Sequence, residues 1–135
     1  MRIMKVIILC GGQGTRLREE TEYRPKPLVM VGNRPMLWHI MKLYSHYGYN
    51  DFVLCLGYKG EMIKNYFLNY DELAHDFTLH LGSGKKEVLH HQNTTPRWSI
   101  TFADTGQSCE TGSRIARIRQ YIGDDEEFML TYGDA

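Results

Sequence analysis

The chain has 135 residues, and its 16 basic and 16 acidic side chains give a formal net charge of zero. That length corresponds to about one domain, and 42% hydrophobic with 24% charged residues is ordinary for a soluble globular protein. The neutral balance excludes a broad basic surface for nucleic acid or for an anionic membrane, so any anion site has to be local.

We expect the N-terminal segment to be neither a membrane span nor a secretory signal. The apolar run that follows Lys5 is far too short to cross a bilayer, and no small-residue cleavage site accompanies it. The three cysteines are odd in number and widely spaced, which argues against a disulfide framework or a zinc site and fits a reducing compartment. We therefore expect a cytoplasmic protein with neither a membrane nor a nucleic-acid partner. The cysteines are Cys10, Cys55 and Cys109.

The first predicted element is a buried strand over residues 4–10, because its apolar residues form a continuous run. A turn with three glycines at positions 11–14 follows it. Glycine lets a ligand approach the main chain closely, and successive N–H groups in such a turn form a concavity for anions. Thr15 and Arg16 add a hydroxyl and a guanidinium, so the turn suits a phosphate. It lacks the lysine of a P-loop and the third glycine of a dinucleotide fingerprint, and an ordinary flexible turn is the alternative.

Two prolines flank Lys26. Pro25 and Pro27 forbid a regular helix and predict an extended segment, in which a lysine loses little freedom when it meets an anion. The alternative is a solvated lysine in a proline-rich connector.

The next segments alternate between helix and strand. A helix is predicted to open at residues 33–35 and to end at Gly48, and a buried strand is predicted over residues 52–56. The turn 57–60 leads into a second helix that runs through Tyr70. This alternation implies right-handed crossovers and a parallel sheet. The expected apolar face of the first helix is Met36, Leu37, Ile40, Met41, Leu43, Tyr44 and Tyr47.

The pattern weakens between residues 71 and 97, where we expect a short strand at 77–81 and an exposed turn at 82–86. His90 and His91 are adjacent, so they would point to opposite faces of a strand, and no third ligand is evident nearby. We interpret them as solvated histidines.

An alternating strand over residues 98–103 precedes a helix at 113–121. Thr111 and Arg114 lie at the entrance of this helix, where free N–H groups and the helix dipole favour an anion. A second anion site is one interpretation, and a helix cap with a surface arginine is the other.

The last predicted strand covers residues 128–132 and is expected to be buried. It ends in Gly133 and Asp134. A carboxylate just past the carboxyl end of a strand lies where open α/β sheets place ligand chemistry.

These stretches together resemble the signature series of the sugar-1-phosphate nucleotidylyltransferases. The likeness covers most of the chain, is weakest over residues 71–97, and is greatest to the glucose-1-phosphate cytidylyltransferase branch. For the family it rests on Leu9–Leu17, Pro25–Pro27 and Gly133–Asp134, and for the branch on Glu19–Thr21, Pro35–Lys42, Gly57–Gly60, Asp104–Gly106 and Thr111–Gly112.

The resemblance implies an α/β protein with the three-layer αβα, Rossmann-like fold of the nucleotide-diphospho-sugar transferases, built on a mainly parallel sheet. It implies that residues 1–135 are the nucleotide-binding part of one such domain, without the C-terminal half that supplies the sugar-phosphate site. The last strand would then end at an edge that the other half covers. An assembly of several identical subunits is expected by the same resemblance.

The activity implied is transfer of CMP from CTP to α-D-glucose 1-phosphate with Mg²⁺, giving CDP-glucose and pyrophosphate. A sugar phosphate is already an anionic nucleophile, so the task is to align two anions and to stabilise charge. Arg16 would hold the departing pyrophosphate, Lys26 the α-phosphate and Asp134 the Mg²⁺. Thymidylyl, uridylyl or guanylyl transfer, or a non-catalytic nucleotide-binding module, are the alternatives. The implied nucleotide-binding residues are Leu9, Cys10, Gly11, Gly12, Gln13, Gly14, Thr15, Arg16, Lys26, Thr111 and Arg114.

Two residues depart from the family pattern. Cys10 stands where the family usually has alanine, an exchange between small residues that indicates packing, with a reactive thiol as the alternative. Ala135 replaces a usual glycine, which would stiffen the turn after Asp134.

Overall fold

The fold is built on a sheet of four parallel strands. The computed structural model describes residues 4–11, 24–88, 95–106, 111–122 and 127–133, apart from the side chains of residues 88 and 111–115. Along the sheet the strand order is β7-β4-β1-β8, and each neighbouring pair is parallel. The strands are β1 (Val6–Leu9), β4 (Asp51–Leu56), β7 (Ser99–Asp104) and β8 (Met129–Tyr132).

The chain enters this sheet near its middle, at β1. It proceeds to β4 and β7 on one side and then crosses to β8 on the other, so the direction of strand addition reverses between β1 and β8. In open α/β sheets this reversal leaves a crevice at the carboxyl ends of the two strands, where ligands bind. The predicted parallel sheet is confirmed.

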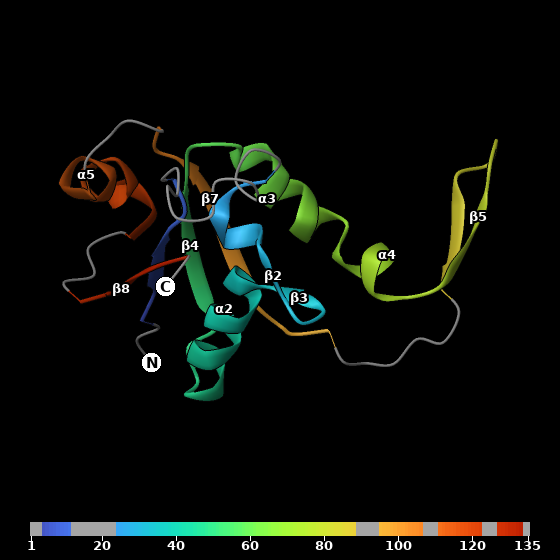
Figure 1. The fold of residues 1–135 in the computed structure, drawn as a ribbon, viewed down its shortest axis with the longest axis horizontal. Coiled ribbons are helices and arrows are strands. Elements are labelled where there is room, and N and C mark those ends of the chain that lie inside the picture. Colours follow the sequence, from blue (N-terminus) through green and yellow to red (C-terminus); the bar gives the residue numbers. More distant parts are fainter. Residues whose placement is uncertain (1–3, 12–23, 89–94, 107–110, 123–126, 134–135) are drawn as a thin grey trace.

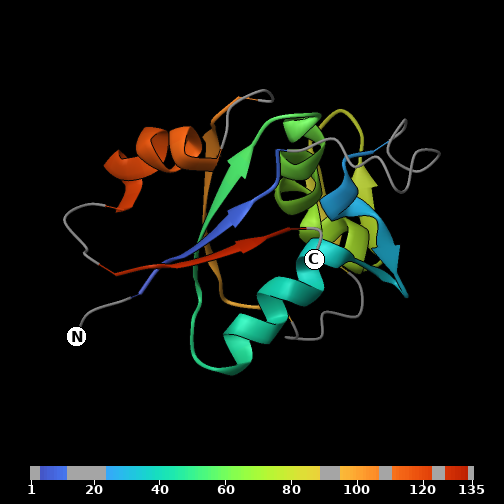
Figure 2. The same ribbon diagram turned by 60° about the vertical axis from the view of Figure 1, so that its left-hand side comes forward.

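Helices cover both faces of the sheet and complete the expected three layers (Figures 1 and 2). Helices α2 (Met36–His46) and α3 (Gly60–Leu68) pack on one face, and α5 (Thr111–Ile122) packs on the other. Within the described ranges, no helix is long and apolar enough to cross a bilayer.

Strand β1 lies at the centre of the core. Val6 and Ile8 face α2 and α3, whereas Ile7 and Leu9 face α5, and all four are buried. Successive side chains of a strand point to opposite faces, so a strand covered on both sides has to be apolar at every position. The continuous apolar run of the sequence therefore identified this strand correctly.

Strand β8 differs from the prediction. Within the described sheet it has β1 as its one neighbour, and Leu130 and Tyr132 are 43% and 52% exposed. Among the described residues it is a half-covered edge strand, so the expectation of a buried strand was wrong.

The segment before α2 also differs from the prediction. Arg34–Pro35 forms β3, a short strand that pairs with β2 (Met30–Val31), and the helix begins only at Met36. Pro35 has ψ 153°, which is extended, and it serves as the N-cap. Of the predicted apolar face of α2, Leu37 and Met41 are buried and Ile40 and Tyr44 pack against the core, while Leu43 and Tyr47 are exposed.

The predicted helix through Tyr70 is interrupted. Helix α3 ends at Leu68, and a separate short helix, α4 (Tyr70–Ala74), follows Asn69. The side-chain amide of Asn69 donates to the Asn65 carbonyl at 3.0 Å. The Asn69 N–H keeps the regular hydrogen bond to the same carbonyl, also at 3.0 Å, so the main chain and the side chain of Asn69 share one acceptor where α3 ends.

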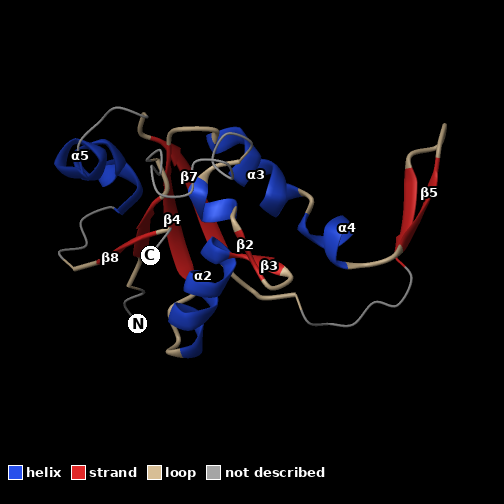
Figure 3. Ribbon diagram, in the orientation of Figure 1, coloured by secondary structure: helices blue, strands red, loops and turns tan. Residues whose placement is uncertain are grey.

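A hairpin extends from α4 and stands away from the sheet (Figures 1 and 3). Its strands are β5 (Phe77–His80) and β6 (Lys85–Val88), and they pair antiparallel. The strand expected at 77–81 is present, but β6 occupies residues assigned in part to a turn. Between the hairpin and α4, the Lys86 ammonium donates to the Glu72 carboxylate at 2.5 Å.

Candidate functional site

The candidate site lies where β1 and β8 end, at the reversal of strand order. The Gly133 N–H donates to the Leu9 carbonyl at 2.9 Å and so extends the pairing of the two strands by one residue. On the other side, the Cys10 N–H donates to the Cys55 carbonyl of β4 at 2.9 Å. The backbone at Cys10 and at Gly133 is therefore fixed to the rigid sheet.

The proline-rich segment around Lys26 lies next to the end of β8. A Cβ atom built on Gly133 would lie 3.0 Å from the Cys10 sulfur and 3.2 Å from Cγ of Pro27. No side chain fits at position 133 without a shift, because 3.4–4 Å is the ordinary range of such contacts. Three segments that are far apart in the sequence thus converge beside Gly133.

Lys26 is the first residue of a short 3-10 turn, η1 (Lys26–Leu28), so the expectation of an extended segment was wrong. The Leu28 N–H donates to the Pro25 carbonyl at 2.9 Å and the Val29 N–H to the Lys26 carbonyl at 3.1 Å. Pro27 and Leu28 are buried, while Lys26 is half-buried. The lysine is therefore anchored on both sides by buried residues, as its flanking prolines indicated.

The start of the glycine turn is tied to the turn after β4. The Gly11 carbonyl accepts a hydrogen bond from the Tyr58 N–H at 3.4 Å. Lys59 follows in the left-handed region with φ 51°, and its ammonium lies 5.4 Å from the centre of the Tyr58 ring. Sequence reasoning did not single out Lys59, although its position just after a buried strand was the signal that could have found it.

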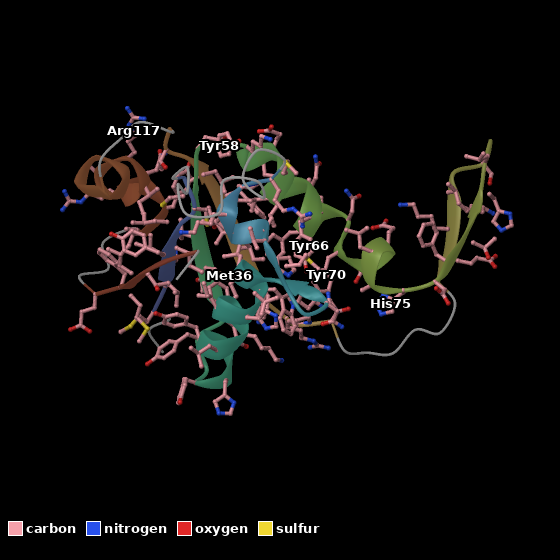
Figure 4. All side chains as sticks on the ribbon, viewed as in Figure 1. Met36, Tyr58, Tyr66, Tyr70, His75 and Arg117 are labelled. Atoms are coloured by element: carbon pink, nitrogen blue, oxygen red, sulfur yellow. The ribbon has the colours of Figure 1, made fainter. Side chains whose placement is uncertain are left out.

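The end of β7 forms the neighbouring part of this edge (Figure 4). Thr105 is buried, and both its N–H and its hydroxyl donate to the Leu56 carbonyl, at 3.0 and 3.3 Å. The Arg117 guanidinium of α5 donates to the Thr105 carbonyl at 2.8 Å. Asp104 pairs with Lys64 of α3 at 3.0 Å. These contacts fix the point at which the chain leaves β7 toward the start of α5, and Arg117 was not predicted.

A hollow of about 320 Å³ borders η1. Tyr66 of α3 contributes to its wall, and burial raises the pKa of this phenol, while the nearby positive charge of Arg34 acts in the opposite direction. The lining residues are Arg24, Leu28, Met30, Pro35, Met62 and Tyr66.

Several predicted site residues lie outside the described ranges. They are Gly12, Gln13, Gly14, Thr15, Arg16 and Asp134, together with His90, His91 and Cys109. Thr111 and Arg114 belong to the first turns of α5, but their side chains are not described. Among the described residues, no group of three His, Cys, Asp or Glu side chains is placed to hold a metal ion.

The fold is that of a Rossmann-like α/β domain, and the candidate ligand site lies at the reversal of strand order. A family model described as nucleotidyl transferase matches residues 5–135, and the chain belongs to this family.

Two curated relatives are similar to this chain over nearly its whole length. The chain is 52% identical over 131 residues to the glucose-1-phosphate cytidylyltransferase of Salmonella typhimurium, covering 97% of this chain and 50% of that protein. The probable glucose-1-phosphate cytidylyltransferase of Bacillus subtilis gives the same identity and the same coverage. The chain thus spans about half the length of the curated relatives it matches.

Solved structures share the fold. HddC from Yersinia pseudotuberculosis superposes with a TM-score of 0.68 at 23% identity, over 98% of this chain and 48% of that one. The UTP-bound UGPase of Acinetobacter baumannii gives a TM-score of 0.70 at 20% identity, over 98% of this chain and 46% of that one.

Proposed function

We propose that the described domain is the nucleotide-binding part of an enzyme that transfers CMP from CTP to α-D-glucose 1-phosphate. The observation that carries this proposal is the approach of Cys10 and Pro27 to Gly133, because it brings three signature segments to one point at the reversal of strand order. The 52% identity to glucose-1-phosphate cytidylyltransferases supports the choice of base and sugar.

In this proposal the glycine turn at residues 11–14 donates its N–H groups to the triphosphate, and Thr15 and Arg16 bind the part that leaves as pyrophosphate. Lys26 neutralises the α-phosphate and the approaching sugar phosphate. A phosphate oxygen of glucose 1-phosphate attacks the α-phosphorus, a new P–O bond forms, and the bond to the β-phosphate breaks with its electron pair leaving on pyrophosphate. Both reactants are anions at neutral pH, so alignment and charge neutralisation replace a general base.

Asp134 suits a Mg²⁺ ion by its chemistry and by its place. Mg²⁺ prefers oxygen ligands and is usually held by one or two carboxylates together with substrate phosphates, instead of a cage made by the protein alone. A single aspartate two residues after the end of β8 fits that mode. When bound, the ion neutralises charge on the phosphates. Thr111 and Arg114, at the entrance of α5, would line the nucleotide pocket.

The partners in this proposal are CTP and glucose 1-phosphate, and the enzyme works in the cytoplasm as an assembly of identical subunits. Light scattering of the protein in solution tests the assembly, and a monomer at micromolar concentration would contradict it.

Calorimetry of the 135-residue chain with CTP, UTP, dTTP and GTP, each with Mg²⁺ or with EDTA, tests the nucleotide assignment. We expect CTP to bind at least about tenfold more tightly than the other three, since a base is distinguished by hydrogen bonds that the wrong base leaves unmade. Preference for another nucleotide would assign a different specificity. Assays of the whole protein then test CDP-glucose formation, and tight CTP binding without turnover would indicate a non-catalytic module.

A further inference from the structure

From the hydrogen bonds at the end of β7, we infer that Arg117 is a positioning residue for nucleotide selection. Its guanidinium holds the main chain at Thr105 at the ligand edge of the sheet, and so fixes the end of β7 relative to α5. The inference rests on the proposed function and deepens it, since it assigns part of the choice of base to a residue that no sequence motif indicated.

Thr105 is the residue that is held. It is 1% exposed, and it is the one polar side chain that the described ranges bury. Its N–H and its hydroxyl both donate to the Leu56 carbonyl, at 3.0 and 3.3 Å, and its own carbonyl accepts from the Arg117 guanidinium at 2.8 Å. A buried polar group that loses its partner costs free energy. Three hydrogen bonds therefore favour one position of the Thr105 main chain.

Arg117 joins two elements that follow each other in the chain. Strand β7 ends at Asp104 and α5 begins at Thr111. The residue after Arg117, Ile118, is fully buried in the core beneath α5, so the sheet anchors this part of the helix. From that anchored turn the guanidinium reaches back to Thr105, and a hydrogen bond from a charged donor is stronger than a neutral one. In Figure 4, Arg117 and Tyr58 lie at the same end of the molecule, where β4 and β7 end.

The end of β7 is within reach of a nucleotide bound at β1. The two strands are separated only by β4. Neighbouring strands lie about 4.8 Å apart, so the ends of β1 and β7 are about 10 Å apart, a distance that an extended nucleoside triphosphate spans. With the triphosphate on the glycine turn after β1 and the entrance of α5 beside it, the base lies toward β7. A base is selected by hydrogen bonds that need correct placement, and Arg117 is in a position to maintain it.

A direct contact between Arg117 and the ligand is the competing explanation. The bond to Thr105 uses one nitrogen of the guanidinium, Nη1, and a guanidinium has several further N–H donors. Such donors are suited to a phosphate. The two explanations differ in what they predict, because a positioning residue affects the choice of base whereas a phosphate contact affects every nucleotide equally.

Calorimetry of the 135-residue chain with Mg²⁺·CTP and with Mg²⁺·UTP gives two affinities, and their ratio measures the selectivity. Arg117→Met removes the donor and keeps the length of the side chain. We expect the ratio to fall at least about threefold, mainly through weaker binding of CTP. Arg117→Lys keeps a charged donor, and we expect it to recover at least about half of the lost selectivity. An unchanged ratio in Arg117→Met would overturn the inference.

Two further measurements separate positioning from the other roles. Thermal unfolding without nucleotide gives the stability of each variant. A merely structural role would lower the unfolding temperature and weaken CTP and UTP by the same factor, which overturns the inference. Inorganic tripolyphosphate has no base, and we expect Arg117→Met to bind it within about twofold of the unaltered chain. A loss of tripolyphosphate affinity as large as the loss of CTP affinity would establish a phosphate contact instead.

Arg119 provides a matched control. It carries the same charge on the same helix, it is exposed, and it lies two residues further along, so it points in another direction. Arg119→Met should keep the ratio of CTP to UTP affinity. An equal fall of the ratio in Arg119→Met would mean that the overall charge of α5 sets the selectivity, and it would overturn the role of Arg117.

If Arg117→Met does not fold, Thr105→Val replaces it, because it removes the hydroxyl bond to Leu56 from the same main-chain position. We expect Thr105→Val to lower the ratio at least about twofold, while Thr101→Val on the same strand keeps it. An unchanged ratio in Thr105→Val would then overturn the inference. Failure of the unaltered chain to bind CTP at all would refute the proposed function as well. A chain that prefers CTP and keeps this preference in Arg117→Met refutes the inference alone.

Discussion

The turn between β4 and α3 offers a direct test of how closely the fold is packed near the site. Gly60 is the first residue of α3, and a Cβ atom added there would lie 2.9 Å from Cβ of Leu56, the last residue of β4. Both atoms are attached directly to the backbone, so neither can rotate away. We therefore expect Gly60→Ala to push the start of α3 away from the sheet, although alanine is the better helix former.

The expected loss of stability in Gly60→Ala comes from overpacking at this contact. Forcing one extra carbon into a filled contact typically costs about 1–3 kcal/mol, and the helix preference of alanine recovers less than about 1 kcal/mol at a helix start. We expect a net loss of about 1–2 kcal/mol in the free energy of unfolding. For a chain of this size that corresponds to a decrease of about 4–7 °C in the unfolding temperature.

Urea unfolding followed by circular dichroism and by tyrosine and tryptophan fluorescence measures this loss. Glu61→Ala is the control, since Glu61 is exposed and adjacent, and its removal should cost less than about 1 kcal/mol through the helix dipole. If Gly60→Ala unfolds at the same urea concentration as the unaltered chain, the start of α3 can shift freely, and the rigid contact with Leu56 does not exist.

Three further changes test other parts of the structure. Lys26→Ala should reduce CTP affinity about tenfold or more with little change in the unfolding temperature, and equal losses would remove its proposed role. Arg117→Met should cost about 1–3 kcal/mol of stability in urea unfolding, because the Thr105 carbonyl loses a charged donor; a neutral result would mean that water replaces it. The hydrogen bond from Lys86 lowers the pKa of Glu72 below its ordinary value, so the stabilisation from this pair is present above that ordinary value and is lost as the pH falls through the lowered one. Glu72→Gln should abolish that part of the acid dependence, and an unchanged pH profile of unfolding would contradict the pairing.

The sequence predicted the parallel sheet well because burial on both faces leaves a continuous apolar run. This holds for β1 and β4, whose residues Val6–Leu9 and Phe52–Leu56 are nearly all inaccessible. Helix α5 was found for a related reason, since Ile118 and Ile122 recur at helical spacing and are both buried. In these elements local pattern and tertiary environment agree.

The sequence predicted less where pairing, and not burial, creates the element. Strand β6 consists mainly of Lys85, Lys86 and Glu87, which carry no apolar period, and it exists through its hydrogen bonds with β5. Strand β3 at Arg34–Pro35 is two residues long, and proline at that position resembles the opening of a helix. Such elements depend on a partner segment that the local sequence does not identify.

The burial of strand β8 was predicted wrongly for a different reason. Its sequence is apolar enough for a buried strand, but the described residues leave one side of it without a neighbouring strand. Whether an apolar strand lies in the middle or at the edge of a sheet depends on what else pairs with it. Apolar pattern alone therefore overestimates burial at a sheet edge.

In the site, the position of some residues follows from the strand pattern, whereas the position of others depends on packing that the local sequence does not show. Parallel topology alone requires the residues after β1 and β8 to lie at the same edge, so the pairing of Gly133 with the end of β1 follows from the strand pattern. The place of Lys26 does not follow from it, because η1 is neither strand nor long helix and is oriented by the packing of Pro27 on Gly133. That packing works because position 133 has no side chain. The position of the turn that carries Lys26 therefore depends on a glycine, which a search for charged residues would pass over.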